Sequence, residues 1–289
     1  MTFSSAGRGP IVAATDFSDD ARNAVRRAAM LASRHGAALQ LLHVVSGPSL
    51  DALREWAPAG SAERLVEDAG RLLEQEAAAA GAPAKARLAV GDVLEELLAA
   101  CAGASLVVLG AHGLNPLRDA ILGTTAVRLV GRCTAPTLVV RSAPQGEYQR
   151  ALVALDLRPG SAGLIEAARR IAPGAQITAA HAYDVAFEGA LQRAGVEIAA
   201  IERHRMQAAA KAHAAIEQLG AAAGAPGIVS VIERAHPARH IVETQRTLRA
   251  DLVVIGKRRR SAVASILLGS VTRHVLADAE ADVLVLEAA

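Results

Sequence analysis

Aromatic residues are almost absent from this sequence. Three Phe, two Tyr and one Trp make up 2% of its 289 residues, so the core must be built mainly from Ala, Val, Leu and Ile. The same scarcity argues against a protein that stacks single-stranded nucleic acid on aromatic side chains. No apolar run reaches the roughly 18 residues of a transmembrane helix, and residues 1–9 lack the apolar segment of a signal peptide. We therefore expect a cytoplasmic protein that has no membrane partner.

The sequence also lacks an excess of charge of either sign. Residues 1–145 carry 14 basic and 14 acidic side chains, and residues 146–289 carry 17 and 15. Neither half has the basic surface of a duplex-binding protein, so we expect no nucleic-acid partner. The two cysteines, Cys101 and Cys133, lie in predicted helices and are too few for a disulfide framework. We interpret them as reduced thiols.

One internal duplication organises the chain. Residues 105–110 match residues 251–256 at an offset of 146 positions, and similar matches recur along both halves. The joint, residues 142–149, is polar and contains Pro and Gly, as is typical of a linker. The sequence therefore predicts two domains, residues 1–144 and 149–289.

Each half alternates strands with helices. In the first half we predict strands at residues 10–15, 38–45, 85–90, 105–110 and 137–141. We predict helices at residues 18–35, 61–80 and 92–101 and one that starts at 123–125, with a loop before residue 61. The second half repeats this order with a longer second helix at about 190–223. The last two strands are continuous apolar runs, which indicates parallel strands buried on both faces.

These elements predict an α/β fold of two tandem, doubly wound domains, each a five-stranded parallel sheet flanked by helices. In such sheets the ligand crevice lies beyond the carboxyl ends of the strands, where the strand order reverses. Asp16, Val44 and Gly110 follow or end the three strands that meet there. We expect them to surround one crevice.

The glycines after the fourth strand predict a phosphate site. Gly110 ends the strand, and Gly113 allows close approach to the main chain. Nine residues later, Gly123, Thr124 and Thr125 open a helix, whose N-terminal N–H groups and dipole favour an anion. The spacing is neither a Walker A loop nor the dinucleotide-binding fingerprint.

This pattern resembles that of the universal stress proteins. Their ATP-binding members carry G-x2-G-x9-G followed by Ser or Thr after the fourth strand, as the first half does here. Residues 14–18 and 42–45 resemble the family as well, and the resemblance covers nearly the whole chain in both halves. It implies an adenine nucleotide alpha hydrolase-like fold.

The resemblance also implies a ligand, ATP or a related adenine nucleotide, with Mg²⁺ accompanying a triphosphate. Asp16 and the main chain at Val44 would hold the adenosine part, and the glycines and hydroxyls would hold the ribose and phosphates. The cofactor-binding residues implied for the first domain are Ala14, Thr15, Asp16, Val44, Gly110, His112, Gly113, Gly123, Thr124 and Thr125. Alternatives stay open, since Asp16 can be a helix cap or a satisfied carboxylate at the end of the strand, and Gly113 can serve a plain turn.

The second half departs from the pattern. Arg259 stands where the second glycine belongs, within four consecutive cations at residues 257–260. Either this crevice has lost nucleotide binding, or the cations bind a different anion or a partner surface. The residues of this weaker second site are Asp156, Gly256, Arg259, Gly269, Ser270 and Val271.

No catalytic or metal-binding motif is apparent. We interpret His43 and His181 as packed, hydrogen-bonded residues, and nothing assigns a role to Asp184 or Glu188. The hypothesis that follows is a stress-response protein that binds a nucleotide and at most hydrolyses ATP slowly. The competing hypothesis is an interaction scaffold that uses neither crevice.

The last strands of the two halves are expected to pair. In single-domain relatives two subunits associate, often through this strand, and a tandem chain would do so internally. Residues 137–141 and 282–287 are the candidate strands. We therefore expect an internal pseudo-dimer, with a further homodimer left open.

Overall fold

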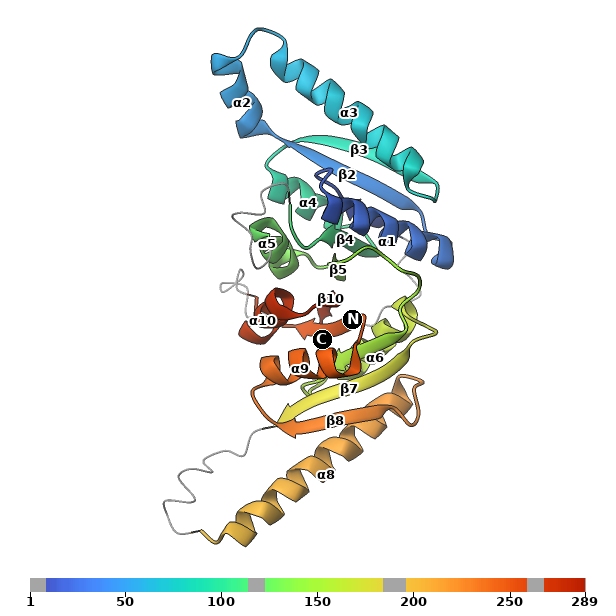
Figure 1. The fold of residues 1–289 in the computed structure, drawn as a ribbon, viewed down its shortest axis with the longest axis vertical. Helices are drawn as coiled ribbons and strands as arrows, with labels where there is room; N and C mark the ends of the chain where they lie inside the picture. Colours follow the sequence, from blue (N-terminus) through green and yellow to red (C-terminus); the bar gives the residue numbers. More distant parts are fainter. Residues whose placement is uncertain (1–8, 114–122, 184–195, 259–267, 289) are drawn as a thin grey trace.

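Ten strands form one sheet in the computed structural model, which describes residues 9–113, 123–183, 196–258 and 268–288. Their order is β3-β2-β1-β4-β5-β10-β9-β6-β7-β8 (Figure 1). The strands are β1 (Ile11–Ala14), β2 (Leu39–Ser46), β3 (Ala84–Gly91), β4 (Leu106–Gly110), β5 (Thr137–Val140), β6 (Arg150–Ala154), β7 (Gln176–Tyr183), β8 (Val229–Arg234), β9 (Leu252–Lys257) and β10 (Asp282–Glu287).

Helices cover both faces of this sheet. The described helices are α1 (Asp19–His35), α2 (Gly47–Trp56), α3 (Ser61–Ala79), α4 (Val93–Cys101), α5 (Thr124–Arg132), α6 (Ser161–Ile171), α8 (Ile198–Ala222), α9 (Pro237–Leu248) and α10 (Ser270–Asp278). Figure 1 shows α1 and α6 on one side of the sheet and α5 and α10 on the other. Among these described helices, none combines the length and the apolar character needed to cross a bilayer.

The two halves repeat one topology. Each contributes five parallel strands, in the order 3-2-1-4-5 in the first half and 8-7-6-9-10, read from its outer edge, in the second. The order reverses at β1 and β4 in the first half and at β6 and β9 in the second. The predicted fold class, two tandem doubly wound α/β domains, is confirmed.

Strands near the middle of the sheet are buried on both faces. Along β5, Leu138 and Val140 belong to the core under α1 and α6, whereas Val139 belongs to the core under α5 and α10. β10 alternates in the same way, with Leu284 in the first core and Val283 in the second. This alternation follows from the period of two in a strand, and it explains why both strands read as continuous apolar runs.

The halves join through β5 and β10, the one antiparallel pair among the described strands. Val139 lies opposite Val283 and Leu138 opposite Leu284, as the sequence predicted for these two segments. Asp282 opens β10 and is buried, and it accepts a hydrogen bond from the hydroxyl of Tyr148 at 2.6 Å. Burial raises the pKa of Asp282 despite this hydrogen bond.

A cation completes this buried polar network. The guanidinium of Arg27 lies 4.0 Å from the ring centre of Tyr148 and 3.5 Å from the Asp282 carboxylate. Arg27 also donates to the carbonyl of Gly146, at 2.7 Å, in the segment between the domains. Since isolated buried charges are costly, these contacts make the joint between the halves well defined.

Three sequence predictions need correction. The segment predicted as a loop before residue 61 contains α2, which Ser46 caps by accepting a hydrogen bond from Ser49 N. The long helix of the second half begins at Ile198, later than predicted, and residues 190–195 of that prediction lie outside the described residues. Cys133 follows the last turn of α5 as its cap residue and is not within the helix.

Candidate functional site

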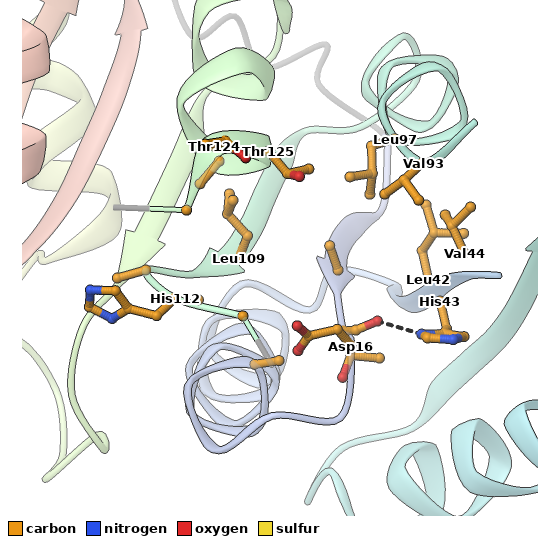
Figure 2. Close-up of a pocket in the computed structure, with 18 residues that line it drawn as sticks. Asp16, Leu42, His43, Val44, Val93, Leu97, Leu109, His112, Thr124 and Thr125 are labelled. Atoms are coloured by element: carbon orange, nitrogen blue, oxygen red, sulfur yellow. Dashed lines mark hydrogen bonds between the residues drawn. The ribbon is translucent and has the colours of Figure 1, made fainter. Parts of the chain in front are cut away.

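A cavity of about 190 Å³ opens beyond the carboxyl ends of β1, β2 and β4 (Figure 2). All ten residues predicted for the first domain line it: Ala14, Thr15, Asp16, Val44, Gly110, His112, Gly113, Gly123, Thr124 and Thr125. Val93 and Leu97 of α4 form an apolar wall that the sequence did not predict. Their positions carry no signal in the sequence, because only the packing of α4 brings this helix to the crevice.

Asp16 holds a tight turn between β1 and α1. Its Oδ1 accepts a hydrogen bond from Ser18 N at 3.0 Å, and Phe17 between them adopts the left-handed conformation with φ of 68°. A left-handed bulky residue is uncommon, and such conformations concentrate at functional sites. The cap of α1 is Ser18, as predicted, since its hydroxyl accepts from Ala21 N at 3.2 Å. The alternative of Asp16 as that cap is therefore wrong.

Gly110 and Gly113 both lie close to groups of other elements, but only Gly110 lies against backbone. A Cβ atom on Gly110 would lie 2.7 Å from the backbone carbon of Asp20, where β4 packs against α1. A Cβ atom on Gly113 would lie 2.8 Å from Oδ2 of Asp16. Gly113 thus leaves room for the Asp16 carboxylate in its present position.

The N-terminus of α5 faces the same cavity. Gly123 is the cap residue and provides no side chain to accept from the first N–H groups of the helix. Gly123 N itself donates to the carbonyl of Ala111 at 2.9 Å, which ties the helix start to the end of β4. Exposed Thr124 and Thr125 follow. An uncapped helix start with two hydroxyls is suited to an anion.

The edge of β2 supplies main-chain groups. Thr15 N donates to the carbonyl of Leu42 at 2.9 Å, so the main-chain groups of Leu42 face β1. Val44 lies two residues further along β2, so its main-chain groups point in the same direction as those of Leu42. The part of β1 that pairs with β2 ends at Ala14, opposite Leu42, and does not reach Val44. The main-chain N–H and C=O of Val44 therefore face the crevice that Val44 lines.

The histidines of the first crevice hold the loops in place. His43 Nδ1 lies 2.8 Å from the carbonyl of Thr15, and His181 Nδ1 lies at the same distance from that of Leu155 in the second half. Both are packed and hydrogen-bonded, as predicted. His112 lines the crevice with its Nδ1 2.8 Å from Oδ2 of Asp20 in the first turn of α1. Among the described residues, no group of three or more His, Cys, Asp or Glu side chains is arranged to hold a metal ion.

A second cavity, of about 340 Å³, opens at the equivalent place in the second half. Five of the six residues predicted there line it: Asp156, Gly256, Gly269, Ser270 and Val271. The sixth, Arg259, lies outside the described residues, as do Asp184 and Glu188. Leu157, which follows Asp156, again has a left-handed φ, of 56°.

The second crevice differs in what occupies its aspartate. Arg258 forms an ion pair with Oδ2 of Asp156, and Ser161 donates to Oδ1 at 3.2 Å. Burial opposes ionisation of Asp156, yet the hydrogen bonds from Arg258 and from the backbone of Arg158 hold its pKa below the usual range. The aspartate that faces a glycine in the first crevice is thus neutralised by a side chain of its own domain in the second.

Comparison with known proteins agrees with this duplicated architecture. The model of the universal stress protein family matches residues 7–141 and 147–287. A universal stress protein of Mycolicibacterium smegmatis is 26% identical over 300 residues, which cover 95% of this chain and 96% of that protein.

A solved structure that matches nearly the whole chain has the same fold. The crystal structure of a universal stress protein from Archaeoglobus fulgidus is 18% identical, with a TM-score of 0.66 over 97% of this chain and 98% of its own, and it supports the fold alone. A universal stress protein in complex with cAMP is 29% identical and matches 50% of this chain and 100% of its own, with a TM-score of 0.35. With the family model matched in both halves, this chain belongs to the universal stress protein family.

Proposed function

We propose that the first domain, residues 1–144, binds ATP or a related adenine nucleotide in the crevice of Figure 2. One observation carries the proposal: three elements distant in the sequence bring Asp16, the free edge of Val44 and the uncapped start of α5 to one cavity. We further propose that the protein is cytoplasmic and acts in a stress response, with residues 149–289 as a domain whose own crevice is degenerate.

Each part of the crevice suits one part of the nucleotide. The main-chain N–H and C=O of Val44 provide a donor and an acceptor for adenine, between the apolar side chains of Val93 and Leu97. The carboxylate of Asp16 accepts hydrogen bonds from hydroxyl groups of the adenosine part. The first N–H groups of α5, with Thr124 and Thr125, bind the phosphates. Mg²⁺ would enter with a triphosphate, held by its phosphate oxygens.

Adenine in this pocket is held without aromatic stacking. The described residues that line the cavity include no Phe, Tyr or Trp, and the ring of Phe17 packs against His43 at 4.4 Å. Aliphatic side chains can bury the base, and main-chain hydrogen bonds then select its edge. We therefore expect discrimination among bases to depend on the backbone at Val44.

The test is isothermal titration of ligand-stripped protein with ATP, ADP and adenosine, after mass spectrometry of any ligand released from the purified protein. We expect binding to one site per chain. In Gly113→Arg, which copies the second half, binding should be lost because the side chain enters the space beside Asp16. Gly174→Arg is the matched control, since a Cβ atom there meets nothing within 4 Å.

Two results would contradict the proposal. Wild-type protein that binds no adenine nucleotide would favour the scaffold hypothesis, in which neither crevice is used. Binding that survives Gly113→Arg would place the ligand elsewhere. Phosphate release above that of a heat-inactivated control would instead add slow hydrolysis to the proposed function.

A further inference from the structure

Each domain provides a cation to the helix that begins at the other domain's crevice. Lys257, at the end of β9, donates from Nζ to the carbonyl of Val130 at 2.6 Å and to that of Cys133, both at the end of α5. Arg141, directly after β5, donates to the carbonyl of Leu276 and, at 3.4 Å, to that of Ala277, both at the end of α10. Val130 and Leu276 lie 146 positions apart, the offset of the duplication. The acceptor carbonyls are therefore related by the internal repeat, whereas the donors are not, since Lys257 corresponds to Ala111 and Arg141 to Glu287.

The antiparallel pairing of β5 with β10 explains this exchange. α5 begins at the carboxyl end of β4 and ends just before β5 begins. Because β10 runs antiparallel to β5, the beginning of β5 lies beside the carboxyl ends of β10 and β9, where the second crevice opens. The helix that starts at the first crevice thus ends beside the second.

The side chain of Lys257 is buried at this contact. Lys257 is only 6% exposed, and its ammonium lies among the last carbonyls of α5, which have no partner within the helix. A buried ammonium needs such acceptors, and a cation at a helix C-terminus complements the negative end of the dipole. The contact therefore holds α5 in one position relative to the second domain.

The opposite end of α5 belongs to the first crevice. α5 has nine residues, so at 1.5 Å per residue its two ends are roughly 13 Å apart. A shift of the helix would move the N–H groups of Thr124 and Thr125 relative to Asp16, which sits on a separate element. The charge of Lys257 also attracts an anion at that N-terminus, through a largely protein interior.

We infer that Lys257 is a positioning residue for the first crevice, so that the second domain regulates the affinity of the first domain for phosphates. The inference rests on the proposed function, since it concerns the same site. Lys257 also lines the second crevice with Gly256 and Arg258. A ligand there that displaces Lys257 would, by linkage, change phosphate affinity in the first crevice.

The test compares ATP with adenosine in Lys257→Met. Methionine fills the buried space without the charge, and we expect ATP to bind roughly three- to tenfold more weakly, in the range of a helix-terminus charge effect. Adenosine affinity should change much less, because adenosine lacks the phosphates that we assign to the N–H groups at the start of α5. Lys257→Gln retains an N–H donor but no charge and should give a smaller loss, and it serves if Lys257→Met does not fold.

Arg141→Met is the matched control. It removes the contact at the equivalent end of α10 and should disturb the joint between the domains to a similar degree, but it leaves the contact at the end of α5 in place. We expect its ratio of ATP to adenosine affinity to equal that of the wild type. A folded Lys257 variant with the wild-type ratio, or an equal loss in Arg141→Met, would overturn the inference.

Hydrogen exchange separates this inference from the proposed function. In Lys257→Met the amides of α5 should exchange faster, by roughly the same factor as the ATP affinity falls, whereas those of α10 should not. If wild-type protein binds no ATP, the proposed function fails, and the exchange of α5 still reports whether Lys257 positions this helix. Unchanged exchange in α5 would overturn the inference on its own.

Discussion

The two crevices have the same backbone arrangement and differ in the group that lies against the aspartate. Both have an aspartate after the first strand of the domain, a left-handed residue after it and an uncapped helix start. In the first, the backbone of Gly113 approaches Asp16; in the second, the side chain of Arg258 pairs with Asp156. One fold can thus place either the main chain of a glycine or the side chain of an arginine against this carboxylate, depending on the residues that follow the glycine at the end of the fourth strand.

The crevices also differ at the second strand. Val44 lines the first cavity, but its counterpart Ala182, which follows His181, is not among the residues around the second. Pro237 and Ile241 of α9 line the second cavity, as Val93 and Leu97 of α4 line the first. The second crevice is larger, about 340 Å³ against about 190 Å³, and among the described residues Ala182 does not contribute to its lining. Volume alone therefore does not identify the nucleotide site.

The largest expected difference concerns the two aspartates. Asp16→Ala should weaken ATP binding at least tenfold, because a charge-assisted hydrogen bond contributes roughly 1.5–3 kcal/mol. Asp156→Ala should leave ATP affinity unchanged, since Arg258 already occupies that carboxylate. Isothermal titration of both variants measures this. Equal losses in the two would show that the crevices are not functionally distinct.

The next difference concerns stability. Gly110→Ala should lower the free energy of unfolding by about 1–3 kcal/mol, because the new Cβ meets the backbone of Asp20 at 2.7 Å and of Ala21 at 2.9 Å. Gly256→Ala should cost less, since the Cβ meets the side chains of Ala288 and Leu164 at 3.0 and 3.4 Å. Urea denaturation checks the order, and a larger loss in Gly256→Ala would refute it.

A smaller effect is expected from converting the second crevice. Arg258→His with Arg259→Gly copies His112 and Gly113 and frees Asp156 from its ion pair. We expect the second ATP site to be weak, because Ala182, the counterpart of Val44, is not among the described residues that line this cavity. The stoichiometry of titration rises above one per chain if this is right. A site as strong as the first would show that the β2 edge is dispensable.

The smallest effect is the acid dependence of the Asp156–Arg258 pair. A carboxyl with a folded pKa below its unfolded value of 3.8 stabilises the fold above that value, and this contribution is lost as the pH falls through the folded pKa. Both side chains are nearly half exposed, so we expect well under about 1 kcal/mol. Thermal melts from about pH 5 to about pH 3 should fall slightly less steeply for Arg258→Met. An identical slope would show that the pair is energetically silent.

Much of the first crevice could be predicted from the sequence. Strand ends are marked by apolar runs followed by Asp16 or Gly110, and parallel topology brings such ends to one edge. α2 escaped prediction because it buries little besides Leu50, so it has almost no apolar stripe, although Ser46 and Pro48 mark its start. The helix-start signals at Ser46 and Pro48 would therefore have predicted α2, whereas the spacing of apolar residues would not.

The cations at residues 257–260 show where sequence reasoning stops. In the sequence they form one cluster, but the structure separates its described members, since successive side chains of a strand point to opposite faces. Lys257 is buried against α5 of the other domain, and Arg258 is half exposed and paired with Asp156. Both partners lie more than 100 residues away, and no local pattern encodes such contacts.

The β5–β10 pairing bears on how the protein is made. Thr137 through Val140 are fully buried, and one side of their strand is covered by β10, whose paired residues come more than 140 positions later. During synthesis the first domain therefore emerges with an apolar edge strand that has no partner, a state prone to aggregation. Once β10 emerges, its tether makes the pairing intramolecular and favourable at any protein concentration. In a fused chain, β5 thus does not need to find a second subunit, but it stays unpaired during synthesis until β10 has emerged from the ribosome.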